Sequence, residues 1–156
     1  MIIIQSPKDI HALSSSWKRA GKTISLVPTM GCLHEGQLSL IRMARAASDK
    51  TIISLFVNPI QFSQNEDLDS YPNQFEKDCR LIEHEGGDAL FCPSSEQMYT
   101  DPFQTSISVK TLSQGMCGTG RPHHFGGVAT VVTKLFNITV PDVAVFGEKD
   151  FQQLVI

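Results

Sequence analysis

The chain has 156 residues, a formal net charge of −3 at pH 7 and a pI near 5.9. The acidic balance argues against nucleic acid as a partner, because proteins that bind it usually carry basic patches. No apolar run reaches the ~18 residues of a transmembrane helix, and the opening Met-Ile-Ile-Ile lacks the basic region of a signal peptide. The composition, 41% hydrophobic and 19% charged, predicts one globular domain over residues 1–156, in the cytoplasm and without a membrane partner.

Apolar runs alternate with amphipathic segments in the first part of the chain. We predict a strand over residues 2–5 and a helix from Ser6 to Arg19, with Pro7 in its first turn. The same patterns predict a strand over residues 23–27, an amphipathic helix over 38–47 and a β-branched strand over 51–57.

The alternation continues in the second part. A helix over residues 73–85 is predicted to be capped by Asn73 and to bury Phe75, Cys79 and Ile82. The remaining predictions are a strand over residues 88–92, a strand over 106–109, a glycine-containing loop over 115–120, a helix over 128–139, a strand over 143–146 and a last helix after Gly147. Strands that alternate with helices predict an α/β fold, a doubly wound parallel sheet.

The most informative stretch follows the strand over residues 23–27 and precedes a helix. It contains Met30, Gly31, Cys32, Leu33, His34, Glu35, Gly36 and Gln37. A glycine-containing turn between a strand and a helix gathers backbone N–H groups and the positive helix end at one point, which suits a phosphate. His34 could be a polar residue of the helix start, but we favour it as a donor to a phosphoryl oxygen.

Two further polar clusters follow predicted strands. Asn58 and Gln61 come after the strand over residues 51–57, and Gly147, Glu148, Lys149 and Asp150 come after the strand over 143–146. The carboxyl ends of parallel strands share one edge, where open α/β sheets bind ligands. We therefore expect the three clusters to converge. Lys149 opposes the dipole of the helix that follows, which favours an anion between them.

Other polar residues leave alternatives open. Gln61 and Gln153 could be surface amides or could bind a small hydroxy acid, since each amide donates and accepts. Asp67, Asp69 and Tyr71 are interpreted as solvated, and the stretch Arg121–His124 as a solvated loop or an anion site. The spacing of Cys32, Cys79, Cys92 and Cys117 predicts reduced thiols. Cys117 with His123 and His124 is interpreted as loop rather than metal site, because a second ligand pair is missing.

Five ordered motifs together resemble the pantothenate synthetase (pantoate–β-alanine ligase) family. They are VPTMGCLHEG (27–36), FVNPIQF (56–62), NEDLDSYP (65–72), RPHHFGGVATVV (121–132) and PDVAVFGEKDFQQL (141–154). The resemblance implies a Rossmann-like domain of the nucleotidyltransferase type. It also implies that ATP and Mg²⁺ drive condensation of pantoate with β-alanine through a pantoyl adenylate, and that the protein is a homodimer.

The resemblance assigns roles to matching positions. Residues 30–37 and 147–150 would line the ATP site, with His34 and Lys149 neutralising phosphate charge. Gln61 and Gln153 would hold pantoate, with Gln61 also near β-alanine and Asn58 among the substrate-binding residues. His34, Gln37 and Lys149 would be the catalytic residues, without a metal held by protein ligands.

Two departures from the family pattern carry predictions. The second histidine of its His-x-Gly-His motif is Gln37 here, and losing one charged donor of this kind costs ~2.7–4 kcal/mol, so adenylation should be slowed. Family members run to about 280 residues and close a Lys-Met-Ser-Lys-Ser-like loop over the phosphates, so this chain should bind weakly and turn over poorly. The alternatives are another nucleotidyltransferase and a non-catalytic or degenerate module that binds ATP and pantoate.

Overall fold

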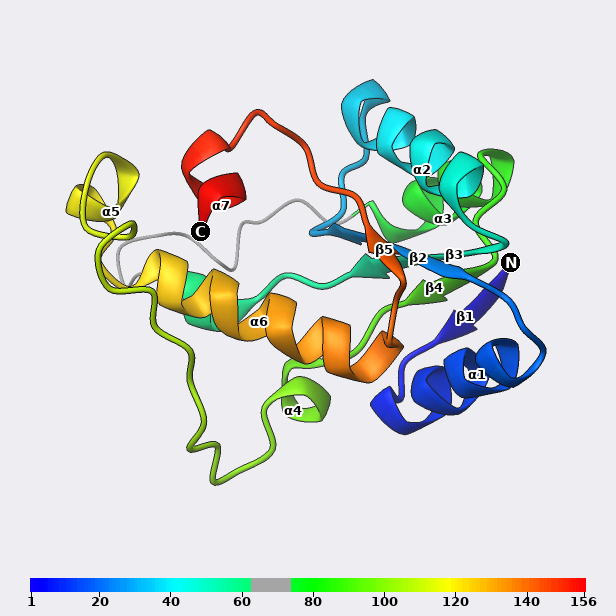
Figure 1. Cartoon of the computed structure of the whole chain (residues 1–156), viewed down its shortest axis with the longest axis horizontal. Coiled ribbons are helices and arrows are strands. Elements are labelled where there is room, and N and C mark those ends of the chain that lie inside the picture. The colour runs from blue at the N-terminus through cyan, green and yellow to red at the C-terminus, as the bar shows by residue number, and fades with distance from the viewer. Residues whose placement is uncertain (63–73) are drawn as a thin grey trace.

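One parallel sheet forms the centre of the molecule. The computed structural model describes residues 1–62 and 74–156. Its strands are β1 (Ile2–Ile4), β2 (Ile24–Thr29), β3 (Lys50–Leu55), β4 (Ala89–Phe91) and β5 (Val143–Ala144), in the spatial order β1-β4-β3-β2-β5 (Figure 1). All four pairings are parallel, which confirms the predicted Rossmann-like α/β fold.

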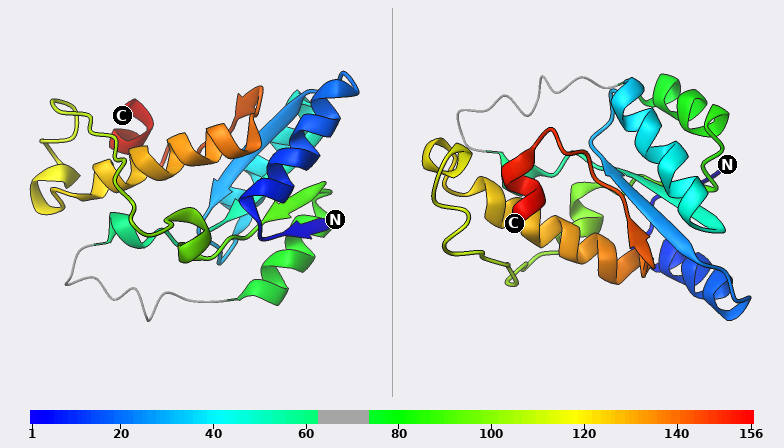
Figure 2. Two further views of the ribbon diagram at one scale, coloured as in Figure 1. Left: turned by 90° about the horizontal axis from the view of Figure 1, so that it is seen from below. Right: turned by 45° about the horizontal axis from the view of Figure 1, so that its top comes forward.

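Helices cover both faces of the sheet. One face carries α1 (Pro7–Arg19) and α6 (His124–Thr139), which contact each other, and the opposite face carries α2 (Glu35–Ala47) and α3 (Phe75–His84) (Figure 1). The shorter helices are η1 (Pro59–Gln61), α4 (Ser95–Met98), α5 (Cys117–Gly120) and α7 (Phe151–Val155). Three views agree that α7 lies beside the N-terminal half of α6 (Figure 2).

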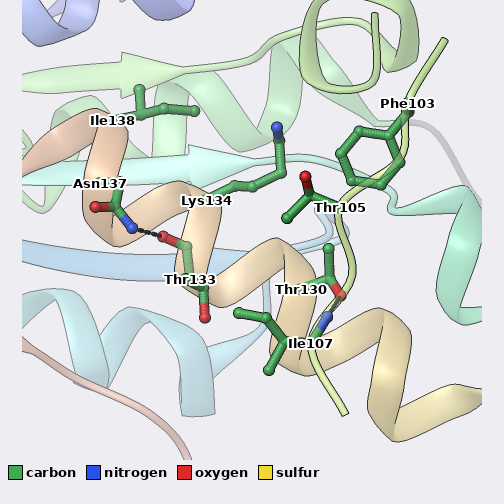
Figure 3. A pocket seen from close by; sticks show the side chains of 8 residues that line it. All are labelled: Phe103, Thr105, Ile107, Thr130, Thr133, Lys134, Asn137 and Ile138. Carbon is green, nitrogen blue, oxygen red and sulfur yellow. Dashed lines mark hydrogen bonds between the residues drawn. The ribbon is translucent and has the colours of Figure 1, made fainter. Parts of the chain in front are cut away.

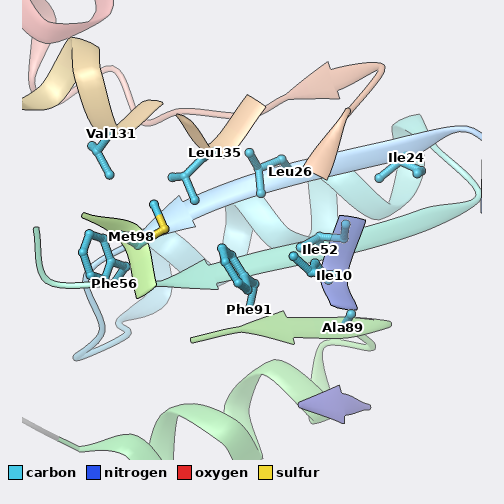
Figure 4. Close-up of a cluster of buried hydrophobic side chains, with 10 residues drawn as sticks. All are labelled: Ile10, Ile24, Leu26, Ile52, Phe56, Ala89, Phe91, Met98, Val131 and Leu135. Atoms are coloured by element: carbon cyan, nitrogen blue, oxygen red, sulfur yellow. The ribbon is translucent and has the colours of Figure 1, made fainter. Parts of the chain in front are cut away.

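Alternate residues along each central strand supply two separate cores. In β2, Leu26 packs toward α1 and α6 whereas its neighbour Val27 packs toward α2 and α3, as the pleat of a strand requires. Figure 4 shows the first of these cores, in which Phe91 and Leu135 are among the buried side chains. Burial on both faces is why the strands are continuous apolar runs in the sequence.

Local capping sets where the helices begin. Ser6 Oγ accepts the N–H of Asp9 at 3.3 Å and caps α1, which begins at Pro7. Two other helices begin earlier than the apolar periodicity indicates. Helix α2 begins at Glu35 rather than at residue 38, and α6 begins at His124 rather than at 128. Polar and glycine residues make up most of their first turns, with Phe125 of α6 as an apolar exception, so the regular apolar spacing starts later than the helices do.

Several predicted details are wrong. Residues 106–109 form no strand; the segment runs along α6, and the Ile107 N–H donates to Thr130 Oγ1 instead of to a strand. The last strand ends at Ala144. Helix α3 buries Asp78 and Ile82, whereas Phe75 is 37% exposed. The predicted cap Asn73 and the acids Asp67 and Asp69 lie outside the described residues, as does Tyr71.

Two further predictions concern cysteines and membranes. None of the four cysteines, all of which the structure describes, forms a disulfide. Within residues 1–62 and 74–156, every helix is too short or too polar to cross a bilayer.

Candidate functional site

A buried carboxylate accepts hydrogen bonds from the turn after β2. Asp78 of α3 is 1% exposed, and its two oxygens accept the N–H groups of Cys32 at 2.8 Å and Leu33 at 2.9 Å. Gly31 has a φ of +90°, and a Cβ there would lie 3.2 Å from Asp78 Oδ2. The turn therefore needs glycine for both its backbone angle and its approach to the carboxylate.

This arrangement changes the expected role of the turn. We predicted that its N–H groups would face a phosphate, but those of Cys32 and Leu33 donate to Asp78. Leu33 is 5% exposed and belongs to the core beneath α2. Sequence reasoning missed Asp78 because it assigned the inward face of α3 to apolar residues.

His34 and Gln37 cap helix α2 reciprocally. The Gly36 N–H donates to His34 Nδ1 at 3.1 Å, and the His34 N–H donates to Gln37 Oε1 at 2.9 Å. Because Nδ1 accepts, the proton of the neutral ring sits on Nε2. His34 is thus a hydrogen-bond donor through Nε2, and Gln37 belongs to the helix cap.

Asn58 and Gln61 lie together after β3. Asn58 is 1% exposed, and its Nδ2 donates to Gln61 Oε1 and to the Gly127 carbonyl, both at 3.1 Å. Gln61 Nε2 donates to Met30 Sδ at 3.2 Å, so the amide spans from Asn58 to the turn after β2. Asn58 contacts Gln61 from the protein interior.

The segment after β5 brings charged groups to the same region. Lys149 is exposed and forms no ion pair within the described part of the chain.

Gln152 Nε2 donates to the carbonyls of Leu112 and Gly115, and its Oε1 accepts the Cys117 N–H. These bonds fasten α7 to the loop before α5, while the neighbouring Gln153 lines a cavity.

A cleft of about 590 Å³ joins the three strand ends. Val128, Val131, Val132 and Leu135 of α6 form much of its apolar wall. The predicted site residues that line it are Met30, His34, Gly36, Gln37, Asn58, Gln61, Gly147, Glu148, Lys149, Asp150 and Gln153. Their convergence at the carboxyl edge of the sheet is confirmed.

Four predicted residues do not line this cleft. Gly31, Cys32 and Leu33 contact Asp78 instead, and Glu35 pairs with Arg42 on the outer surface. The stretch at residues 121–124 supports Gln61 from outside the cleft. The His124 Nδ1–H donates to the Gln61 carbonyl at 3.1 Å, and Arg121 Nη1 lies 3.4 Å from His124 Nε2.

A second cavity, of about 250 Å³, lies between the segment at residues 103–107 and α6. Figure 3 shows Phe103 and Lys134 at this cavity, with Asn137 donating to the backbone of Thr133. It contains none of the predicted site residues. The described residues contain no group of three His, Cys, Asp or Glu side chains arranged for a metal ion.

Residues 2–156 match the family described as Pantoate-beta-alanine ligase. The chain belongs to this family. The pantothenate synthetase of Desulfotalea psychrophila is 58% identical over 151 residues, which are 97% of this chain and 53% of that relative. The pantothenate synthetase of Caldicellulosiruptor bescii is 53% identical over 156 residues, 100% of this chain and 55% of that relative. The chain thus spans about half the length of these ligases.

Solved structures of the pantoate-β-alanine ligase family share the fold. The Thermus thermophilus enzyme superposes with a TM-score of 0.94 at 40% identity, covering 100% of this chain and 55% of the other. The Francisella tularensis ligase, complexed with β-γ ATP and β-alanine, also gives 0.94 at 40% identity, covering 99% of this chain and 59% of the other. These likenesses confirm the predicted nucleotidyltransferase-type domain.

Proposed function

We propose that residues 1–156 form the ATP- and pantoate-binding domain of an enzyme that condenses pantoate with β-alanine. The observation that carries the proposal is the single cleft shared by His34, Gln61 and Lys149. The Francisella relative was solved with β-γ ATP and β-alanine, which supports a nucleotide and an amine as ligands of such a site.

The chemistry would proceed in two displacements. The pantoate carboxylate oxygen attacks the α-phosphorus of ATP and pyrophosphate leaves, which gives pantoyl adenylate. The β-alanine amine then attacks the acyl carbon, the C–N bond forms and AMP leaves. Both steps gain from orientation, because holding two reactants together can supply several kcal/mol of the barrier reduction, up to ~7–11.

The residues of the cleft fit these steps. His34 Nε2–H can donate to a phosphoryl oxygen, and Lys149, without a carboxylate partner in the described residues, can neutralise phosphate charge. Gln61 and Gln153 would hold the hydroxyl and carboxylate groups of pantoate. Mg²⁺ would bind together with ATP, because this ion is usually held by one or two carboxylates and by substrate phosphates. Two carboxylates, those of Glu148 and Asp150, line the same cleft.

Gln37 sets the expected rate. Its amide cannot give up a proton usefully, and its Oε1 already accepts the His34 N–H. Replacing Gln37→His should therefore raise pyrophosphate release with ATP and pantoate by up to ~10²-fold.

Gln97→His is the matched control for this substitution. Gln97 Oε1 likewise accepts the Ser94 N–H, at 2.8 Å, in the first turn of α4, but it does not line the cleft. Faster release in Gln37→His alone would support the assignment. An unchanged rate in Gln37→His, or an equal gain in both variants, would refute it.

A non-catalytic module that binds ATP and pantoate is the second candidate. The observation that favours it is the use of Gln37 as a helix cap rather than as an acid. Calorimetry that detects both ligands without pyrophosphate release would select this candidate. Release driven by a different acid in a substrate screen would instead indicate another nucleotidyltransferase.

We also infer that the protein is a cytoplasmic homodimer. The family resemblance supports the dimer, and the reduced thiols predicted from the cysteines support the location. Sedimentation equilibrium of the chain tests the dimer, and a single monomeric species would refute it. Fractionation of the source cells tests the location.

A further inference from the structure

A buried hydrogen-bond chain leads from Tyr99 to the cleft. The Tyr99 hydroxyl lies 2.6 Å from Asn58 Oδ1, and Asn58 Nδ2 lies 3.1 Å from both Gln61 Oε1 and the Gly127 carbonyl oxygen. Tyr99 comes after α4 and was not singled out by its sequence. It is half-buried, although Asn58 beside it is 1% exposed.

The Gly127 carbonyl shows in which direction each bond of this chain donates. A backbone carbonyl only accepts, so the Asn58 atom beside it must be the NH₂ group. The other Asn58 atom is then the carbonyl oxygen, to which the Tyr99 hydroxyl must donate. Since the same NH₂ group donates to Gln61, the near atom of Gln61 is its oxygen, and its NH₂ group points away from Asn58.

Gln61 is consequently presented as a donor. Its Nε2 lies in the cleft region, where it donates to Met30 Sδ at 3.2 Å. A thioether sulfur is a weak acceptor. A ligand oxygen is a stronger acceptor, so the NH₂ group is suited to a carboxylate or hydroxyl oxygen rather than to an ammonium group.

The surroundings hold both ends of the chain in place. The Tyr99 ring packs 6.2 Å from Phe56 and 4.9 Å from Phe103, between centroids, and Lys134 Nζ lies 5.6 Å from its centroid. Burial raises the pKa of the Tyr99 phenol, so it stays a donor at neutral pH. At the other end, a Cβ on Gly127 would lie 2.6 Å from Gln61 Cα, so α6 contacts η1 by backbone.

We propose that Tyr99 is a positioning residue that, through Asn58, fixes Gln61 as a hydrogen-bond donor toward an oxygen of the acid substrate. The inference rests on the proposed function for the identity of that acid, pantoate. Tyr99 itself does not line the cleft. It acts on the substrate only through the orientation of the Gln61 amide.

A double-variant cycle on pantoate affinity tests this. Tyr99→Phe removes one donor to the buried Asn58 carbonyl, and should raise the pantoate dissociation constant about threefold to tenfold in calorimetry. In a Gln61→Ala background, Tyr99→Phe should cause no further loss. Additive losses would show that Tyr99 acts independently of Gln61 and would overturn the inference.

Thr139→Val is the matched control for loss of a buried hydroxyl. Thr139 is 0% exposed and donates to the Leu135 carbonyl at 2.8 Å, at the far end of α6. It should lower thermal stability as Tyr99→Phe does but leave pantoate affinity unchanged. An equal affinity loss in both variants would reduce Tyr99 to a general structural role and contradict the proposal.

A second readout separates this inference from the proposed function. In nitrogen-15 NMR of the chain without ligand, the side-chain NH₂ protons of Asn58 should exchange slowly with water, and Tyr99→Phe should speed that exchange. Faster exchange in a chain that does not bind pantoate would refute the proposed substrate and keep the positioning role. Unchanged exchange in Tyr99→Phe would refute the positioning role whatever the substrate.

Discussion

The two edges of the sheet use charge in opposite ways. At the amino edge, three aspartates each accept a backbone N–H near the start of a strand and pair with a lysine: Asp49 with Thr23 and Lys22, Asp88 with Thr51 and Lys50, and Asp142 with Ile24 and Lys18. At the carboxyl edge, Lys149 has no such partner among the described residues, and the cleft there is lined by amides and an imidazole as well as by the carboxylates Glu148 and Asp150. The amino edge is closed by its own ion pairs, whereas the carboxyl edge keeps donors for an anionic ligand.

Asp78 shares one feature with the amino-edge aspartates, although the turn that it holds lies at the carboxyl edge. It caps backbone N–H groups as the amino-edge aspartates do, but it is buried and holds the turn that carries His34. Asp78→Ala should leave two N–H groups without an acceptor at ~1–3 kcal/mol each, and so lower the unfolding free energy by about 2–6 kcal/mol in urea titrations. The exposed Asp49→Ala should cost clearly less. Equal losses would show that burial does not distinguish the two edges.

Lys149 should dominate nucleotide affinity. A charge-assisted hydrogen bond is worth ~1.5–3 kcal/mol, so Lys149→Met should weaken ATP binding by about tenfold to a hundredfold, measured by calorimetry at low salt. Lys22→Met at the amino edge removes an equal charge and should change affinity little, because Lys22 pairs with Asp49. Similar losses in both would mean that overall charge, not the cleft, attracts ATP.

Gly127 should be sensitive where its neighbour is not. A Cβ at position 127 would lie 2.6 Å from the Ile60 carbonyl oxygen and from Gln61 Cα, whereas one at Gly126 would lie 3.6 Å from its nearest atom. Gly127→Ala should therefore cost ~1–3 kcal/mol by overpacking and weaken pantoate binding. Gly126→Ala should be neutral or stabilising by up to ~1 kcal/mol, as helix propensity predicts. Equal tolerance in thermal unfolding would contradict this close approach.

The smallest effect concerns acid stability at the amino edge. Bonds from the Thr23 backbone and hydroxyl and from Lys22 lower the pKa of Asp49 from 3.8 to about 2. A lowered pKa in the folded state stabilises the fold at pH values above the pKa of the unfolded chain. This stabilisation is lost as the pH falls toward the pKa of the folded state. Thermal unfolding midpoints should thus fall between pH 4 and 2, less steeply in Asp49→Asn. Parallel curves for the two proteins would contradict the shift.

Topology is why the sequence could predict the cleft. Each cluster follows a strand, and parallel strands put their carboxyl ends at one edge, so Gln61 and Lys149 meet although 88 positions separate them. Asp78 could not be predicted in this way. It lies in an amphipathic helix whose apolar spacing indicated Phe75 as a buried residue. A buried carboxylate needs hydrogen-bond donors, and the path of the turn after β2 supplies them.

Alternation alone also misled at residues 106–109. The pattern there is strand-like, but a strand needs a neighbour, and this segment runs along α6 instead. Tyr99 gave no signal because its partner Asn58 lies 41 positions away. These misses share one cause: each depends on a contact that neither periodicity nor spacing encodes.

A crystal structure of the chain soaked with ATP, Mg²⁺ and pantoate tests the central claim most directly. We expect phosphate oxygens within hydrogen-bond distance of His34 Nε2 and Lys149 Nζ, and a pantoate oxygen on Gln61 Nε2. Density for either ligand in the cavity beside Lys134, or at the amino edge of the sheet, with the cleft between the three strand ends empty, would contradict it.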